Sequence, residues 1–183
     1  NMPFVFRNEA HMRAVIDGPI GQELLDKISA SPARMVGLAW MDGGSRSLYT
    51  KKPVQSAADL KGIKWRAYSP ATARIAELVG AQPVTIQAAE VSQAFATSMV
   101  ESMMSSGSTG ADAKLYEHVK YWYDTQAWLP KNALLVNKKA FDALDKPTQD
   151  AVIKAAAEAE VRGWRASEQV DTESIAILKA NGV

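Results

Sequence analysis

Residues 57–70 have the sequence AADLKGIKWRAYSP. Apolar and polar residues alternate from Ile63 to Tyr68, a pattern of period two that predicts a short β-strand. The alternation divides this strand into an apolar side centred on Trp65 and a polar side centred on Arg66. The strand then breaks at Pro70. We expect the apolar side to pack and the arginine side to face a cleft.

Arg66 is the first candidate for a ligand-binding residue. The end of a strand in an open α/β sheet is where such folds bind ligands, and the fixed fork of guanidinium donors matches a carboxylate in a bidentate arrangement. The alternative is a surface arginine that forms a salt bridge. Local spacing leaves both interpretations open.

On either side of this strand, helix and strand patterns alternate along the chain. The predicted helices cover residues 9–16, 20–30, 70–79, 88–98 and 111–118, with a long helix opened by Asp145 and Pro147 and helical turns at 56–59 and 141–144. The turn at 56–59 is expected to be capped, and Gly80 can take the left-handed conformation that ends the helix over 70–79. The predicted strands cover residues 35–40, 63–68, 84–86, 100–104, 121–128 and 133–137. Such alternation is typical of an α/β fold with few long loops.

Two features refine this prediction. Residues 105–110, SSGSTG, are expected to form a flexible loop between a strand and a helix. Small residues recur every three or four positions on the long C-terminal helix, which predicts close packing along that stripe. The stripe consists of Val152, Ala156, Ala159, Gly163, Ala166 and Val170.

Composition is that of an ordinary globular chain with room for a real core. The 183 residues are 47% hydrophobic, and the chain contains 21 basic and 20 acidic residues. The basic residues are scattered, so nothing supports nucleic-acid binding. The lack of cysteine excludes a disulfide scaffold, thiolate metal sites and cysteine catalysis. No stretch is apolar enough to span a membrane, so direct membrane insertion is not expected.

Residues 59–66, DLKGIKWR, resemble the DLKGLKIR signature of the DctP family, the periplasmic solute-binding proteins of TRAP transporters. Further stretches resemble motifs of that family in the same order. They are residues 2–7 with 17–21, 44–46, 79–83, 89–91 and 135–139. No single motif is decisive, but their common order over most of the chain is specific.

The resemblance implies an α/β fold of the periplasmic-binding-protein class, type II, with two lobes, a cleft and a long C-terminal helix. This chain then covers mainly the second lobe. Residues 1–34 are expected to complete the N-terminal lobe and the crossover, 35–137 to form the ligand-binding α/β lobe, and 138–183 to form C-terminal helices that pack across the lobes. We expect the chain to be a fragment that lacks the N-terminal part, signal peptide included, of a periplasmic protein.

The function implied by the resemblance is binding without chemistry. We expect a monomeric solute-binding subunit that captures a carboxylate-containing organic acid and delivers it to TRAP membrane permease subunits. No cofactor, metal or enzymatic activity is expected. An orphan ligand sensor is a second possibility within the same binding class.

The family pattern assigns roles to several residues. Arg66 corresponds to the main carboxylate clamp, and Arg46 to a second arginine at the cleft. Tyr68 and Ser69 are expected to line the same wall with their hydroxyl groups, although Ser69 is equally suited to capping the following helix.

This chain departs from the family pattern after residue 100. The family commonly has VDGQEN or VDGAEN, whereas residues 100–106 here are VESMMSS. By alignment, Ser105 replaces an asparagine and Ser102 a glycine. A shorter hydroxyl side chain leaves more room and fewer directed hydrogen bonds, which disfavours polyhydroxy acids such as sialic or uronic acids as ligands.

Two tryptophans are further candidates for ligand contact. Trp40 and Trp128 each end a predicted strand just before turn residues, where an indole can stack on an apolar or aromatic ligand. The alternative for both is a place in the core. Trp65, Trp122 and Trp164 are assigned to packing.

The rival from another class is a small α/β hydrolase or transferase that uses the Ser105–Gly110 loop, with Arg66 as oxyanion stabiliser. This function needs a general base beside the loop. The chain has two histidines, His11 and His118, and neither has a partner at metal-ligand spacing. The loop lacks both the G-x-S-x-G pattern and a phosphate-loop lysine.

Overall fold

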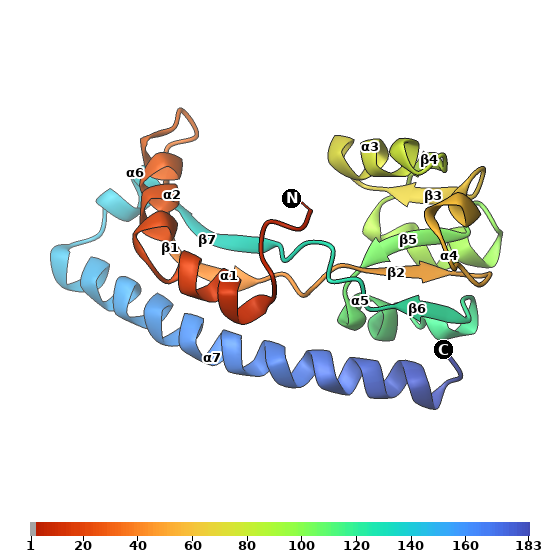
Figure 1. The fold of residues 1–183 in the computed structure, drawn as a ribbon. Coiled ribbons are helices and arrows are strands. Elements are labelled where there is room, and N and C mark those ends of the chain that lie inside the picture. Colours follow the sequence, from red (N-terminus) through yellow and green to blue (C-terminus); the bar gives the residue numbers. More distant parts are fainter. Residues whose placement is uncertain (1–2) are drawn as a thin grey trace. The chain divides into compact units, whose positions relative to one another are not determined.

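The computed structural model describes residues 3–183, which form two compact units (Figure 1). Unit 1 consists mainly of Gly44–Trp128 and Val170–Val183, and unit 2 of Phe4–Gly43 and Leu129–Gln169. These limits differ from the boundaries expected after residues 34 and 137. The physical reason is strand pairing, because the segment that follows residue 34 bonds to a strand near residue 134 and not to the sheet of unit 1.

Unit 1 is built on a mixed sheet with the strand order β4-β3-β5-β2-β6. The strands are β2 (Ser47–Thr50), β3 (Lys64–Ala67), β4 (Gln82–Thr85), β5 (Ser102–Ser105) and β6 (Tyr121–Tyr123). Strand β3 is parallel to β4 and β5, whereas β2 is antiparallel to β5 and β6 (Figure 1). The carboxyl ends of β3, β4 and β5 therefore share one edge with the amino end of β2.

Short helices and apolar side chains complete unit 1. The helices are η1 (Ala57–Leu60), α3 (Pro70–Leu78), η2 (Ala88–Glu90), α4 (Val91–Ala96), α5 (Gly107–Asp112) and η3 (Leu115–Glu117). One buried cluster contains Tyr49, Phe95 and Met103, and a second contains Trp65 and Trp128. Trp65 is 2% exposed, so the apolar side of the strand predicted around it packs as expected.

Unit 2 contains an antiparallel strand pair and three helices, plus most of a fourth. The elements are α1 (Glu9–Ile16), α2 (Pro19–Ala30), β1 (Met35–Asp42), β7 (Lys131–Asn137), α6 (Lys138–Asp142) and α7 (Lys146–Ala180), whose last turns belong to unit 1. Helix α2 packs closely on β1, because a Cβ added at Gly37 would lie 2.6 Å from a Leu25 methyl group. Among the described residues, no helix has the length and apolar character needed to cross a membrane.

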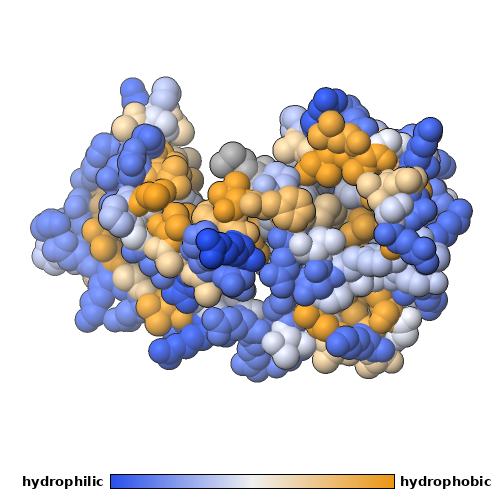
Figure 2. Space-filling model, in the orientation of Figure 1, coloured by the Kyte–Doolittle hydropathy of each residue, from blue (hydrophilic) through white to orange (hydrophobic). Residues whose placement is uncertain are grey.

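Apolar side chains also remain on the surface. Orange patches are visible in the space-filling view (Figure 2). The exposed large apolar side chains include Met41, Leu78, Leu134, Leu135, Ile153, Val161 and Val170. The described residues therefore do not cover all of their own apolar surface.

Most local predictions are confirmed. Ser56 and Asp59 form the expected capping box at the start of η1, each bonding to the backbone of the other. Gly80 ends α3 with φ of 74°, the left-handed conformation predicted for it. These features depend on a few consecutive residues, which is why the sequence alone predicts them.

Strand β2 was not predicted, and it is central to the sheet. All four of its residues are buried, although two of them, Ser47 and Thr50, are polar. A short strand that is buried on both faces shows no alternation, so periodicity cannot find it.

The predictions around β2 need two corrections. Residues 107–112 form helix α5 and not a loop, because Ser106 caps them. The strand predicted over 121–128 stops at Tyr123, since Gln126 has a positive φ of 44° and the backbones of Ala127 and Trp128 bond to Arg46.

The small-residue stripe on α7 does not mark its buried face. Ala159, Gly163 and Ala166 are exposed, whereas the buried residues are Ala156, Trp164, Ser174 and Leu178. The large apolar area of Trp164 selects the side of the helix that turns inward.

Candidate ligand-binding site

Five of the seven candidate residues lie at or beside one edge of the unit 1 sheet. Arg46 directly precedes Ser47, the first residue of β2, and Ser47 pairs with Ser105 of β5. Arg66 is the penultimate residue of β3, and Tyr68 and Ser69 follow that strand. Because carboxyl ends of neighbouring parallel strands form the usual binding edge of such sheets, the structure brings these five residues to a plausible site.

Arg66 is buried, with only 6% of its surface exposed. Its Nε donates a hydrogen bond of 3.0 Å to the carbonyl of Ile86, the residue that follows β4. Its guanidinium carbon lies 4.7 Å from the centre of the Tyr68 ring. Two contacts therefore hold the plane of the guanidinium group, and neither neutralises its charge.

No carboxylate pairs with Arg66 among the residues that the structure describes. Burial lowers the pKa of the guanidinium group, and the nearby charge of Arg46 lowers it further. A buried cation without a counter-ion is costly, and an anionic ligand would relieve that cost. With Nε already bonded, the two Nη atoms are the donors left for a carboxylate.

Arg46 is half-buried, and both its side chain and its backbone form hydrogen bonds. Its Nη1 donates a hydrogen bond of 3.1 Å to the carbonyl of Gly44. Its backbone N–H donates to Trp128 at 3.0 Å, and its carbonyl accepts from Ala127 at 3.0 Å. The side chain adds positive charge near Arg66.

Tyr68 and Ser69 make contacts that the sequence left open. Tyr68 presents its ring to Arg66 in a cation–π contact, and the contact of its hydroxyl with a ligand stays a prediction. The Oγ of Ser69 accepts a hydrogen bond of 3.2 Å from the N–H of Thr72 and so caps α3. The capping alternative is thus confirmed for Ser69, and its contact with a ligand stays a prediction.

Ser105 and Ser106 end β5 with different surroundings. Ser105 is 5% exposed and lies opposite Ser47 in the ladder. Ser106 is fully engaged, because its Oγ accepts from the N–H of Thr109 at 3.2 Å and its carbonyl accepts from the hydroxyl of Tyr49 at 2.8 Å. Ser105 is therefore the better placed of the two to offer a hydroxyl to a ligand.

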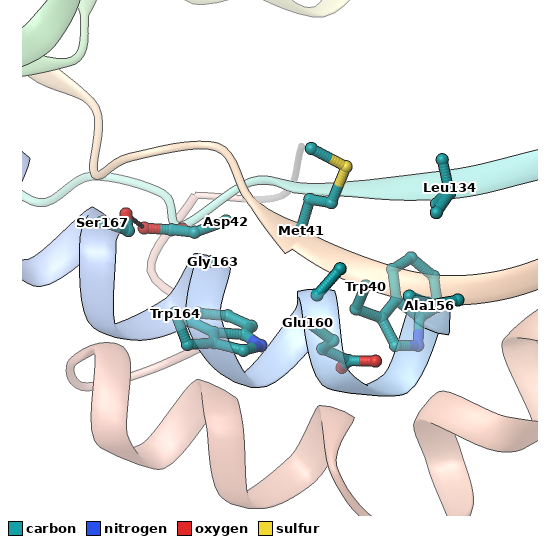
Figure 3. A pocket seen from close by; sticks show the side chains of 11 residues that line it. Trp40, Met41, Asp42, Leu134, Ala156, Glu160, Gly163, Trp164 and Ser167 are labelled. Atoms are coloured by element: carbon teal, nitrogen blue, oxygen red, sulfur yellow. Dashed lines mark hydrogen bonds between the residues drawn. The ribbon is translucent and has the colours of Figure 1, made fainter. Parts of the chain in front are cut away.

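The two candidate tryptophans belong to different units. Trp128 is 4% exposed and packs in the core cluster of unit 1, and its indole N–H is buried without a partner. Trp40 belongs to unit 2, where it lines an apolar cavity of about 290 Å³ with Leu134 and Trp164 (Figure 3). Trp128 also accepts a hydrogen bond of 3.0 Å from the N–H of Arg46 through its carbonyl, and ligand contact by either indole stays a prediction.

A carboxylate and not a histidine lies beside the serine segment, because an oxygen of Asp171 would be 3.2 Å from a Cβ added at Gly107. His118 contacts Ser92 at 3.4 Å, and His11 accepts a hydrogen bond from the N–H of Arg7. Within residues 3–183 no three histidine or acidic side chains gather as a metal site would require. The edge of the sheet thus combines positive charge and hydroxyl groups with nearby carboxylates, those of Asp171 and of Asp124, which accepts a hydrogen bond from Ser47.

Sequence reasoning missed two contributors to this edge. The carbonyl of Ile86 fixes Arg66, and the hydroxyl of Tyr49 fixes Ser106. A carbonyl leaves no trace in a sequence, and Tyr49 lies on the strand that periodicity could not detect.

Comparison with known proteins agrees with the fold and with the motif order. Residues 1–183 match the DctP family, described as bacterial extracellular solute-binding protein, family 7. The structure resembles DctP6 of Bordetella pertussis, an extracytoplasmic solute receptor binding pyroglutamic acid, with 47% identity and a TM-score of 0.91. It also resembles a TRAP periplasmic solute-binding protein of Pseudomonas putida F1 with bound D-glucuronate, with 38% identity and a TM-score of 0.93.

These relatives are longer than this chain. The chain is covered completely in both structural comparisons but spans 60% of each of those proteins. It is also 30% identical to the 2,3-diketo-L-gulonate-binding periplasmic protein YiaO of Escherichia coli K12, with 87% of this chain and 48% of YiaO covered. The shared mixed α/β fold, the long C-terminal helix and the match over every residue lead to one conclusion: the chain belongs to the DctP family of solute-binding proteins.

Proposed function

We propose that this chain forms part of the periplasmic solute-binding subunit of a TRAP transporter, which binds a small organic acid through an arginine clamp and delivers it to the membrane permease. The observation that carries the proposal is the buried guanidinium group of Arg66, which has no acidic partner among the described residues. Similarity to receptors of organic acids supports the same conclusion.

The clamp follows from the donors that remain on Arg66. Its Nε is bonded to Ile86 and its face is covered by Tyr68, so the edge formed by the Nη atoms is left for the ligand. Two parallel N–H···O bonds to one carboxylate combine charge with fixed geometry. Arg46 adds a second positive charge, and Ser105 offers a hydroxyl group at the same edge of the sheet.

A compact cyclic acid fits this chain better than a sugar acid. The Bordetella receptor that shares 47% identity binds pyroglutamic acid, whereas the Pseudomonas protein with D-glucuronate shares 38%. Ser105 provides a short hydroxyl group where the family motif has an asparagine, which leaves fewer directed hydrogen bonds for a sugar acid, whereas Ser102 is completely buried at the other end of β5. We therefore propose pyroglutamate as the first ligand to test.

Calorimetric titration of the full-length protein with small organic acids tests the proposal. L-Pyroglutamate should bind more tightly than D-glucuronate, and 2-pyrrolidinone, which lacks the carboxylate, should not bind. Arg66→Met should abolish binding of pyroglutamate, whereas the control Arg74→Met, which removes an exposed arginine paired with Glu77, should leave it unchanged. Equal affinity in the two variants, or no binding of any acid to the wild type, would exclude the clamp.

A further inference from the structure

Tyr49 is the most deeply buried polar aromatic residue at the proposed site. It lies on β2 with 0% of its surface exposed, opposite Met103 of β5. Its hydroxyl donates a hydrogen bond of 2.8 Å to the carbonyl of Ser106, the residue that caps α5. Burial, with the charge of Asp171, raises the pKa of this phenol, so the hydroxyl keeps the proton that it donates.

Gly110 shows how closely Tyr49 approaches α5. A Cβ added at Gly110 would lie 2.7 Å from the Cζ atom of Tyr49, which is closer than real Cβ atoms come to other groups. The ring therefore occupies the place of a side chain on the helix. Tyr49 therefore contacts the first turn of α5 at two points. Its hydroxyl bonds to Ser106 at the start of the turn, and its ring packs against Gly110 at the end of the turn.

Ser106 is also packed against the segment that carries Arg46. A Cβ added at Gly44 would lie 2.8 Å from the Cβ of Ser106, and the carbonyl of Gly44 accepts the hydrogen bond from Arg46. Gly44 has φ of 68°, a conformation that suits glycine. A shift of Ser106 would therefore disturb both Ser105 and the backbone beside Arg46.

We propose that Tyr49 is a positioning residue of the ligand site, which holds the carbonyl of Ser106 so that the hydroxyl of Ser105 and the side chain of Arg46 face the same ligand. The inference rests on the proposed function. Two contacts then fix the position of Ser105. One is its pairing with Ser47 in the β-ladder, and the other is the hydrogen bond from Tyr49 to the next residue, Ser106. Preorganised donors bind more tightly than mobile ones, because less ordering remains to be done on binding.

Titration of pyroglutamate into Tyr49→Phe tests the inference. This variant keeps the ring in the core and removes only the oxygen that donates to Ser106. One neutral hydrogen bond is worth about 0.5–1.5 kcal/mol, so affinity should fall about threefold to tenfold. The matched control is Tyr123→Phe, which removes the hydroxyl that accepts from the N–H of Val54 at 2.6 Å, beyond the opposite end of β2. The control should lose thermal stability but bind as the wild type does.

Amide hydrogen exchange gives a second readout that needs no ligand. The amides of Thr109 and Gly110 should exchange faster in Tyr49→Phe than in the wild type or in Tyr123→Phe. Gly110→Ala should weaken pyroglutamate binding in the same direction, because the new methyl group displaces the ring of Tyr49. Wild-type affinity in both Tyr49→Phe and Gly110→Ala would overturn the inference while leaving the proposed function intact. A wild type that binds no acid would remove the proposed function, and this inference with it.

Discussion

Each unit of the molecule buries a cation, and the two cations differ in what surrounds them. In unit 2, Lys131 lies 2.7 Å from Asp42, and both side chains are less than 10% exposed. In unit 1, Arg66 is equally buried, but no carboxylate among the described residues compensates its charge. The compensated charge of Lys131 stabilises the fold, whereas the uncompensated charge of Arg66 is the basis of the proposed anion site.

The surroundings of Lys131 show how complete that compensation is. Ser167 of α7 donates a hydrogen bond to Asp42 (Figure 3). Lys131 and Arg13 both lie over the indole of Trp164, at 4.4 and 4.3 Å from a ring centre. Four elements, α1, β1, β7 and α7, are joined in this cluster, and the residues named here all belong to unit 2. Its role is therefore structural.

Asp42→Ala gives the largest expected effect. Removing one partner of a buried ion pair leaves the other charge unpaired, which costs about 3–5 kcal/mol of unfolding free energy. The control is Asp142→Ala, whose pair with Lys138 is about half-exposed and should contribute at most about 1 kcal/mol. Denaturant unfolding of both variants measures the difference. Equal losses would show that the Lys131 pair is not the stabilising contact that its burial indicates.

Arg66→Met tests the uncompensated cation of unit 1. Ligand affinity should fall by about 2–5 kcal/mol, as expected when one partner of a buried charge pair is truncated. The unfolding free energy of the ligand-free protein should change little or rise, because the uncompensated buried charge is removed and the internal bond lost is the one hydrogen bond to the carbonyl of Ile86. Unfolding with and without saturating pyroglutamate checks both points. A loss of stability in the ligand-free state, comparable to that of Asp42→Ala, would identify Arg66 as structural.

Ser69→Ala separates capping from ligand contact at a smaller scale. Loss of the cap on α3 should cost about 1 kcal/mol of stability. Ser69→Asn restores a capping side chain and should recover that loss. If Ser69 also touches the ligand, affinity should stay reduced in both variants. Recovery of stability together with unchanged affinity in Ser69→Asn would assign Ser69 to the cap alone.

Glu9→Gln gives the smallest effect, and it depends on pH. Burial raises the pKa of the Glu9 carboxyl, and the charge of Asp42 adds to the increase, with smaller contributions from Lys131, which opposes it, and Glu168. The folded protein thus holds this proton more tightly than the unfolded chain. The stabilisation is fully present below the ordinary pKa of 4.5 and is lost as pH rises through the higher folded value.

The variant should therefore gain stability relative to the wild type as pH rises from about 4.5 towards neutral. Unfolding midpoints measured across that range check the slope. Glu23→Gln, which removes an exposed carboxylate paired with Lys27, is the control and should track the wild type. A flat difference between Glu9→Gln and the wild type would show that the pKa of Glu9 is not raised in the folded protein.

Local sequence patterns predicted a large part of unit 1. The strand that carries Arg66, the capping box at Ser56 and the left-handed Gly80 are all present. The motif order pointed to five candidate residues that lie on or next to strands whose ends share an edge, Arg66 and Ser105 on the strands and the other three beside them. The patterns failed where burial covers both faces, as in β2, and where one large side chain, Trp164, outweighs a stripe of small ones.

The sequence by itself determined the helix caps, the strand with Arg66 and the family, because each depends on neighbouring residues or on motifs in order. Only the tertiary structure decided which charges meet. Asp42 and Lys131 are 89 positions apart, and no local pattern states that they form a pair. Likewise, no pattern states that Arg66 has no carboxylate partner within residues 3–183, since contacts between distant segments decide which groups surround a buried charge. That choice separates the structural cation of unit 2 from the proposed ligand-binding cation of unit 1.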